Sequence, residues 1–157
     1  MTIQIRTAQA ADAAVISDMV GELLHEIMAT IGSPVFSFNR KDTVTRAKAW
    51  LAEGSYTIFL ASDGATPVGF AALYESRALY AEGTFGTIPE LYVRANARSK
   101  GVGARLLSEV KQFAKARRWK RLEVTTPPLP QFERAKAFYE REGFTVAGGR
   151  KMKVSIL

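Results

Sequence analysis

The stretch from Glu90 to Ala116 places an apolar strand, a short basic loop with two glycines, and an amphipathic helix in direct succession. Leu91 and Val93 alternate as the residues of a strand do. From Val102 onward, apolar residues recur at helical spacing, at positions 102, 106, 107, 110, 113 and 114. The change of period between residues 98 and 103 therefore predicts a loop that leads from a strand into the first turn of a helix.

This loop has the features of a phosphate-binding site. Gly101 and Gly103 carry no Cβ, so a ligand can approach the backbone closely. The first N–H groups of a helix have no acceptor within the helix, and the helix dipole is positive at that end. Arg98 and Lys100 add charge. We expect a pyrophosphate to bind at Arg98, Ser99, Lys100, Gly101, Val102, Gly103 and Ala104.

The sequence of the loop narrows the choice of ligand. It matches neither G-x-G-x-x-G nor G-x-x-x-x-G-K-[ST], so the dinucleotide and P-loop signatures are missing. Arg98-x-x-Gly101-x-Gly103 after a strand instead resembles the acetyl-coenzyme A loop of the GNAT superfamily of N-acetyltransferases. A second segment, A-x-x-F-Y-x-x-x-G-F from Ala135 to Phe144, is similar to one near the end of many GNAT proteins. That family often has Asn three residues before the alanine, where this chain has Phe132.

The resemblance implies a fold and a cofactor. The expected fold is a three-layer α/β domain spanning residues 1–157, with a mixed sheet of about seven strands and about four helices. The expected cofactor is acetyl-coenzyme A (acetyl-CoA), with its pantetheine arm held by backbone groups of Leu91 and Val93.

Periodicity along the chain agrees with such a fold. Strands are predicted near residues 3–5, 56–62, 68–74, 87–93 and 121–126, with a closing hairpin of 144–147 and 152–156. Helices are predicted from Asp12 to Gly32, at 41–52, from Val102, and at 131–142. Residues 79–86 are expected to form a loose connection between two strands.

Composition limits the function. The 157 residues fit one domain, and 47% hydrophobic with 24% charged residues indicates a globular chain. Cysteine is absent and His25 is the single histidine, so we expect no metal site and no cysteine nucleophile. The net charge of +7 attracts polyanions, but many basic residues lie around the predicted loop and helix, which favours coenzyme A over nucleic acid.

Transfer of an acetyl group to an amine requires a base and an acid. The ammonium must lose a proton before it attacks, and Glu90, on the strand beside the expected thioester, is the candidate base. The resemblance implies that Tyr139 is the general acid that protonates the departing thiolate. An amide at Leu91 is expected to polarise the thioester carbonyl.

The acceptor side is predicted less directly. Residues near the end of the first helix, in the loop after it and at the end of the third strand border the acceptor pocket in the family. These are His25, Glu26, Phe36, Phe38, Tyr74 and Glu75. Carboxylates among them suit a cationic amine.

Three functions stay open from the sequence. The first is acetylation of a small-molecule amine, the second acetylation of a protein lysine or N-terminus, and the third a CoA-binding sensor module without turnover. We expect no specific nucleic-acid partner and no membrane partner, while a homodimer is compatible with the sequence. The N-terminus lacks the apolar core of a signal peptide, so a cytoplasmic location is expected.

Overall fold

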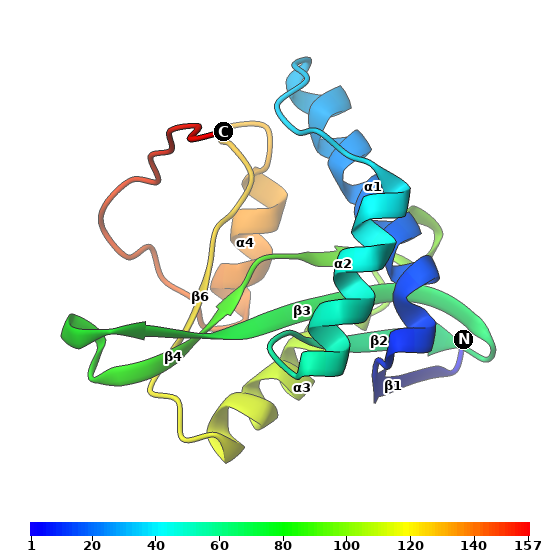
Figure 1. Cartoon of the computed structure of the whole chain (residues 1–157), viewed down its shortest axis with the longest axis horizontal. Helices are drawn as coiled ribbons and strands as arrows, with labels where there is room; N and C mark the ends of the chain where they lie inside the picture. Colours follow the sequence, from blue (N-terminus) through cyan, green and yellow to red (C-terminus); the bar gives the residue numbers. More distant parts are fainter.

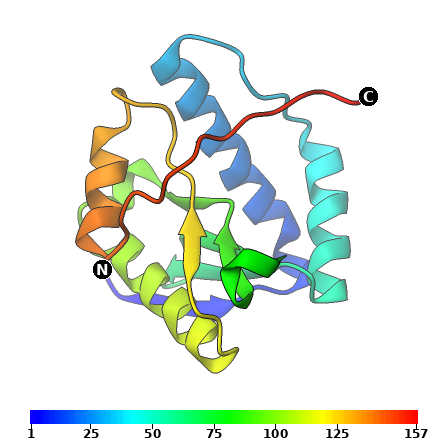
Figure 2. The ribbon, with the colours of Figure 1, turned by 90° about the vertical axis from the view of Figure 1, so that its left-hand side faces the viewer.

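A mixed sheet of six strands separates two pairs of helices in the computed structural model, which describes residues 1–157 (Figure 1). The helices are α1 (Ala13–Ile31), α2 (Arg40–Glu53), α3 (Val102–Ala116) and α4 (Glu133–Arg141). The strands are β1 (Ile3–Thr7), β2 (Thr57–Asp63), β3 (Thr66–Ala78), β4 (Gly83–Ile88), β5 (Leu91–Val93) and β6 (Leu122–Val124). The predicted three-layer α/β fold is confirmed, with α1 and α2 on one side of the sheet and α3 and α4 on the other (Figure 2).

The alternation of β3 builds a core on each side of the sheet. Phe70 and Ala72 face α1 and belong to the core that includes Ile16 and Met19. Ala71 and Leu73 face α3, where the core also contains Leu106. Successive residues of β3 therefore point alternately into the two cores, as the residues of a strand buried on both faces do. We call these two faces the α1–α2 side and the α3–α4 side of the sheet.

One extra residue interrupts the strand that runs beside β3. Tyr74 of β3 lies opposite Thr87 of β4, whereas Ala71 lies opposite Leu91 of β5, so the register shifts by one residue between the two pairs. Ile88 packs on the α3–α4 side and Tyr92 on the α1–α2 side. Side chains four residues apart on an unbroken strand would share a face, so the chain bulges at Pro89 and Glu90.

The bulge opens the sheet on one side of β5. β6 pairs in parallel with β4, and their register ends at Ile88 and Val124. β5 pairs with β3 and with no other strand. Beyond the bulge, the outer edge of β5 is therefore free of strand partners, and this edge leads directly into the loop before α3.

Three of the sequence-based expectations are wrong. The single strand expected at 87–93 is divided into β4 and β5, because the chain bulges between them. Residues 83–86 belong to β4 rather than to a loose connection, because they pair with the far half of the long strand β3. The closing hairpin at 144–147 and 152–156 does not form, and those residues have no strand assignment (Figure 2). Met152, Val154 and Ile156 alternate as predicted but are exposed, since alternation describes a side-chain pattern and does not supply a partner strand. No helix of the chain is long and apolar enough to cross a membrane.

The close pairing of β3 with β5 gives a test of this architecture. A Cβ on Gly69 would lie 2.7 Å from the backbone oxygen of Tyr92, so Gly69→Ala should push β5 away from β3. We expect the free energy of unfolding to fall by about 1–3 kcal/mol in urea titrations. Gly148→Ala is the control, because a Cβ there meets nothing within 4 Å. Equal stability of the two variants would contradict the close β3–β5 approach.

Candidate functional site

The loop before α3 presents a run of unpaired backbone donors. None of the N–H groups from Ser99 to Ala104 has a hydrogen-bond partner, and the first helical bond runs from the Arg105 N–H to the Gly101 oxygen at 3.1 Å. Ser99 and Gly101 have φ values of 62° and 79°, which turn the chain sharply into the helix. These donors lie at the positive end of the α3 dipole, an arrangement that suits an anion.

The two loop glycines have different roles in the structure. A Cβ on Gly101 would meet no atom within 4 Å, so this position is open to a ligand. A Cβ on Gly103 would lie 3.1 Å from the ring of Phe138, so Gly103 lets α4 pack against the start of α3. Gly103 therefore acts through the packing of the helices as well as through its free N–H group.

The basic side chains of the loop are already engaged. Arg98 donates from Nε to the Val93 oxygen at 2.8 Å and from a terminal nitrogen to Glu26 at 2.6 Å. Its guanidinium also lies 5.6 Å from the centre of the Tyr92 ring. Lys100 donates to the Asn96 oxygen at 3.3 Å. The attraction for an anion at this loop thus comes chiefly from backbone donors, with the two cations as supports of the loop.

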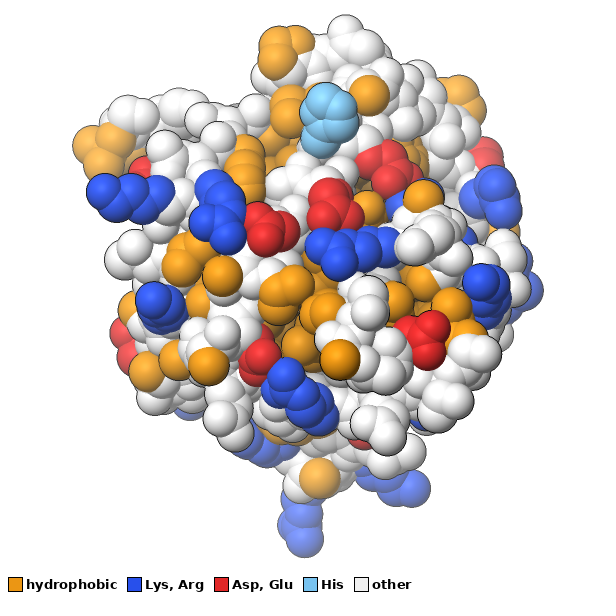
Figure 3. Space-filling model, turned by 90° about the vertical axis from the view of Figure 1, so that its right-hand side faces the viewer, with side chains coloured by type: hydrophobic (Ala, Val, Ile, Leu, Met, Phe, Trp, Pro, Cys, Tyr) orange, Lys and Arg blue, Asp and Glu red, His pale blue; other side chains and the backbone are white.

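Ion pairs join α1 to the end of β5. Arg94 binds Glu22 at 2.9 Å, and the neighbouring Glu26 pairs with Arg98. Figure 3 shows acidic and basic side chains alternating on this face, below the single histidine in pale blue. His25 is exposed. Of the predicted acceptor residues, Glu26 therefore serves an ion pair here, and His25 stands at the surface above it.

The open edge of β5 offers a second set of backbone groups. The Arg94 N–H bonds to the Val68 oxygen at 2.8 Å, and the Glu90 oxygen accepts from the Ala72 N–H at 2.9 Å. Because backbone groups of a strand point alternately to its two edges, those of Leu91 and Val93 face away from β3. The Val93 oxygen accepts from Arg98, while Leu91 keeps its groups free at the edge.

Glu90 stands at the bulge with its carboxylate on the α1–α2 side. The Tyr56 hydroxyl donates a hydrogen bond to it at 2.5 Å. Burial raises the pKa of Glu90 above its usual value, and the bond from Tyr56 lowers that pKa in part. No cation of the chain forms an ion pair with Glu90. A half-buried carboxylate of raised pKa is suited to accept a proton.

Tyr139 lies in the other layer of the molecule. Its ring is 9% exposed and packs on the α3–α4 side between Phe138 and Phe144. Burial raises the pKa of Tyr139 to about 12, so its hydroxyl carries a proton at neutral pH. Glu90 and Tyr139 thus lie on the two opposite sides of the sheet.

Sequence analysis missed two aromatic residues beside Glu90. Tyr56 stacks on Tyr74 at 6.0 Å between ring centres, and Trp50 contacts Tyr56 at 5.1 Å. No sequence motif marks Trp50 or Tyr56. The register of β2 on β3, with Thr57 opposite Leu73, brings Tyr56 next to Tyr74. Both strands were predicted from the sequence, so their pairing was the signal that could have placed Tyr56 beside Tyr74.

The remaining predicted acceptor residues are spread over both faces of the sheet. Phe38 packs over Gly21 of α1, and Phe36 is 45% exposed in the connection from α1 to α2. Tyr74 belongs to the aromatic group beside Glu90. Glu75 points to the opposite side, where it accepts from the Trp119 Nε1 at 3.0 Å. Tyr74 and Glu75 both line one cavity, but the structure does not bring the Glu75 carboxylate together with Glu90.

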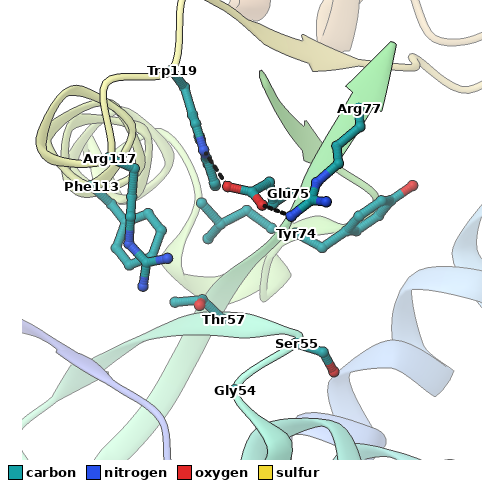
Figure 4. Close-up of a pocket in the computed structure, with 10 residues that line it drawn as sticks. Gly54, Ser55, Thr57, Tyr74, Glu75, Arg77, Phe113, Arg117 and Trp119 are labelled. Atoms are coloured by element: carbon teal, nitrogen blue, oxygen red, sulfur yellow. Dashed lines mark hydrogen bonds and ion pairs between the residues drawn. The ribbon is translucent and has the colours of Figure 1, made fainter. Parts of the chain in front are cut away.

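Glu75 lines a separate cavity of about 310 Å³ near the C-terminal end of α3. Figure 4 shows its carboxylate between Trp119 and Arg77, while Tyr74 points away from it. Arg117 lies over the ring of Phe113 at 4.6 Å on the helix side of this cavity. The cavity lies at the end of α3 opposite to the loop with the free N–H groups.

Comparison with known proteins connects this arrangement to one family. Residues 23–144 match the model of the acetyltransferase (GNAT) family. No curated protein matches the sequence. The fold is similar to that of integron cassette protein HFX_CASS3 from the mobile metagenome of Cole Harbour Salt Marsh, with a TM-score of 0.80 and 27% identity over 98% of this chain and 91% of that one.

Two further solved structures share the fold at lower identity. A predicted acetyltransferase from Clostridium acetobutylicum, solved with acetyl-CoA, has a TM-score of 0.79 and 15% identity over 98% of this chain and 96% of that one. The aminoglycoside acetyltransferase meta-AAC0020 from an uncultured soil metagenomic sample, in complex with sisomicin, has a TM-score of 0.75 and 18% identity, covering 99% of this chain and 96% of that one.

The bond from Tyr56 to Glu90 can be tested by titration. Tyr56→Phe removes a donor that stabilises the charged carboxylate, so the pKa of Glu90 should rise further above its usual value. The measurement is the carboxyl ¹³C shift of Glu90 followed against pH by NMR. Tyr80→Phe is the control, since Tyr80 is exposed and lies in the connection between β3 and β4. A Glu90 pKa that stays the same in Tyr56→Phe would contradict this contact.

Proposed function

The chain belongs to the GNAT family of acetyltransferases, and on that premise we propose that it moves an acetyl group from acetyl-CoA to the primary amine of a small molecule by direct attack. One observation carries the proposal. An unpartnered strand edge runs from a half-buried carboxylate, Glu90, straight into a loop with free N–H groups from Ser99 to Ala104. This order of parts suits an acyl carrier with a phosphate group at one end and a reactive group at the other.

The chain's own groups fit such a carrier. The free N–H groups of residues 99–104 and the α3 dipole would hold the pyrophosphate. The backbone groups of Leu91, with the N–H of Val93, would hold the pantetheine arm as an added strand is held. When bound, acetyl-CoA supplies an acetyl thioester, whose carbonyl carbon gains a C–N bond as its C–S bond breaks.

Glu90 acts as the base in this proposal. An amine attacks only when neutral, and most primary amines are protonated near pH 7, so a proton must leave the nitrogen. The Glu90 carboxylate accepts that proton, directly or through one water. Its raised pKa supports the role, because a carboxylate of raised pKa binds a proton more readily than an ordinary one.

Tyr139 acts as the acid. Its hydroxyl stays protonated at neutral pH and has no hydrogen-bond partner within the chain, so its proton is available to a leaving thiolate. The Leu91 N–H supports the reaction by donating toward the carbonyl oxygen where negative charge develops. The protons of the reaction then balance, because Glu90 accepts one and the Tyr139 hydroxyl donates one.

A small acceptor is favoured over a protein chain. Phe36 and Phe38 give the connection from α1 to α2 apolar side chains, and the aromatic group at Tyr74 gives apolar surface beside Glu90. A protein substrate would require an open groove at this place. Among structures of the same fold, the aminoglycoside acetyltransferase meta-AAC0020 was solved with sisomicin, a small molecule.

The assignment of base and acid can be tested in one experiment. Glu90→Gln removes the proton acceptor and Tyr139→Phe removes the proton donor. We expect each to lower kcat by about 100-fold or more, with the Kd for acetyl-CoA unchanged. CoA release gives kcat, and calorimetry gives the Kd. In the parent protein kcat should rise with pH through the pKa of Glu90, and this limb should vanish in Glu90→Gln. Unchanged turnover in both variants would remove the assignments.

The loop can be tested through charge at a single position. Gly101→Asp puts a carboxylate where we place phosphate, and we expect acetyl-CoA to bind about tenfold or more weakly than to Gly101→Asn. Asn is the matched control because it has nearly the same size and tolerates the same left-handed backbone. Equal affinity of the Asp and Asn variants would count against phosphate binding here.

A panel of amines separates transfer from mere binding. Acetyl-CoA binding with CoA release on at least one small amine supports the proposal. Binding without turnover on any small amine or peptide would instead support a sensor module, and turnover on peptides alone would support a protein substrate.

A further inference from the structure

Trp50, Tyr56 and Tyr74 form an aromatic group beside Glu90, and its two outer rings are open to solvent. Trp50 is 39% exposed and Tyr74 is 37% exposed, while Tyr56 lies between them against the core. The three rings come from α2, the residue just before β2 and the middle of β3, and they end at the Glu90 carboxylate through the Tyr56 hydroxyl. An aromatic surface that is open to solvent and leads to a carboxylate offers two attractions to a cation.

Glu90 is the acid to which the three rings lead, and it forms no ion pair with a cation of the chain. Asp18 pairs with Arg40 at 2.6 Å, and Glu22 and Glu26 pair with arginines that follow β5. Glu75 faces the opposite side of the sheet. A ligand that packs on the aromatic group therefore meets, at its inner end, a carboxylate that the chain itself does not neutralise.

The helix that carries Trp50 has more basic than acidic side chains. α2 carries Arg40, Lys41, Arg46 and Lys48 against Asp42 and Glu53. Arg46 lies 6.0 Å from the centre of the Trp50 ring, so the outermost ring already attracts a cation of the chain. A second positive charge on a ligand would meet a helix surface on which basic side chains outnumber acidic ones.

We propose that Trp50, Tyr56 and Tyr74 form the acceptor wall of this enzyme and select a compact monocationic primary amine with an apolar body, such as an arylalkylamine. The apolar body packs on the rings, and the ammonium points toward Glu90. Polycations such as spermidine are poor acceptors, because the inner end of the wall supplies one carboxylate and the helix beside it carries more basic than acidic side chains. This selection rests on the proposed acetyl transfer at the same site and goes beyond it by naming the acceptor class.

The rings contribute to binding the acceptor and do not take part in proton transfer. Substituting an outer ring by an aliphatic side chain removes the attraction of the ring face for the ammonium but keeps apolar surface. The consequence is a higher KM for the amine, while kcat and the affinity for acetyl-CoA stay the same.

The test compares two acceptors and three variants. CoA release is measured with 2-phenylethylamine and with spermidine for the parent protein, Tyr74→Leu, Trp50→Leu and Tyr80→Leu. Tyr80 is the matched control, because it is an exposed tyrosine in the connection between β3 and β4 and makes no ring contact with the aromatic group. We expect kcat/KM for 2-phenylethylamine to exceed that for spermidine about tenfold or more, and its KM to rise about tenfold in Tyr74→Leu and Trp50→Leu alone.

Direct binding supplies a readout that does not depend on turnover. Calorimetry of 2-phenylethylamine against the parent protein, Tyr74→Leu and Tyr80→Leu should show weaker binding in Tyr74→Leu only. Spermidine preferred over 2-phenylethylamine, or equal KM and Kd in all variants, would overturn the acceptor wall while acetyl transfer stands. No turnover of any amine, with 2-phenylethylamine binding lost in Tyr74→Leu, would overturn the transfer reaction and leave the wall as a cation site.

Discussion

The bulge at Pro89 and Glu90 is the constraint on which the site depends. It shifts the register on β3 by one residue, so that Ile88 faces one side of the sheet and Tyr92 the other. Proline has no N–H to donate to a ladder, which makes position 89 a natural place for the interruption. The pairing of β4 with β6 ends at this point, and beyond it the outer edge of β5 is open. The same extra residue turns Glu90 toward α1 and α2 and frees the backbone of Leu91.

Ion pairs hold this open edge in place. The guanidinium groups of Arg94 and Arg98 bind Glu22 and Glu26 of α1, and Arg98 also spans to the Val93 oxygen. Exposed pairs of this kind contribute modestly to stability. Their geometry matters more here, because they fix the end of β5 and the loop that follows, where the free N–H groups from Ser99 to Ala104 lie. The loop thus offers an anion backbone donors on a supported frame.

Local sequence patterns were enough to predict the loop, the helix after it and the position of Glu90. The change of period at residues 98–103 placed the loop and α3 correctly, and the position of Glu90 before Leu91 placed it at the bulged strand. Tyr56 and Trp50 could not be found in this way, since only the register of β2 on β3 and the packing of α2 bring them to Glu90. Glu75 was grouped with Tyr74 although neighbours on a strand point to opposite faces. The expected hairpin after α4 failed because alternation alone does not provide a partner strand.

The central claim is that free backbone donors along the edge of β5 and the start of α3 bind the acyl carrier. The most direct measurement is a titration of ¹⁵N-labelled protein with coenzyme A, followed by amide NMR shifts. The account predicts that the largest shifts fall on Leu91, Val93 and residues 99–104, with small shifts along β1 and at the exposed chain after residue 145. Shifts confined to other parts of the chain, or no shifts at saturating coenzyme A, would contradict it.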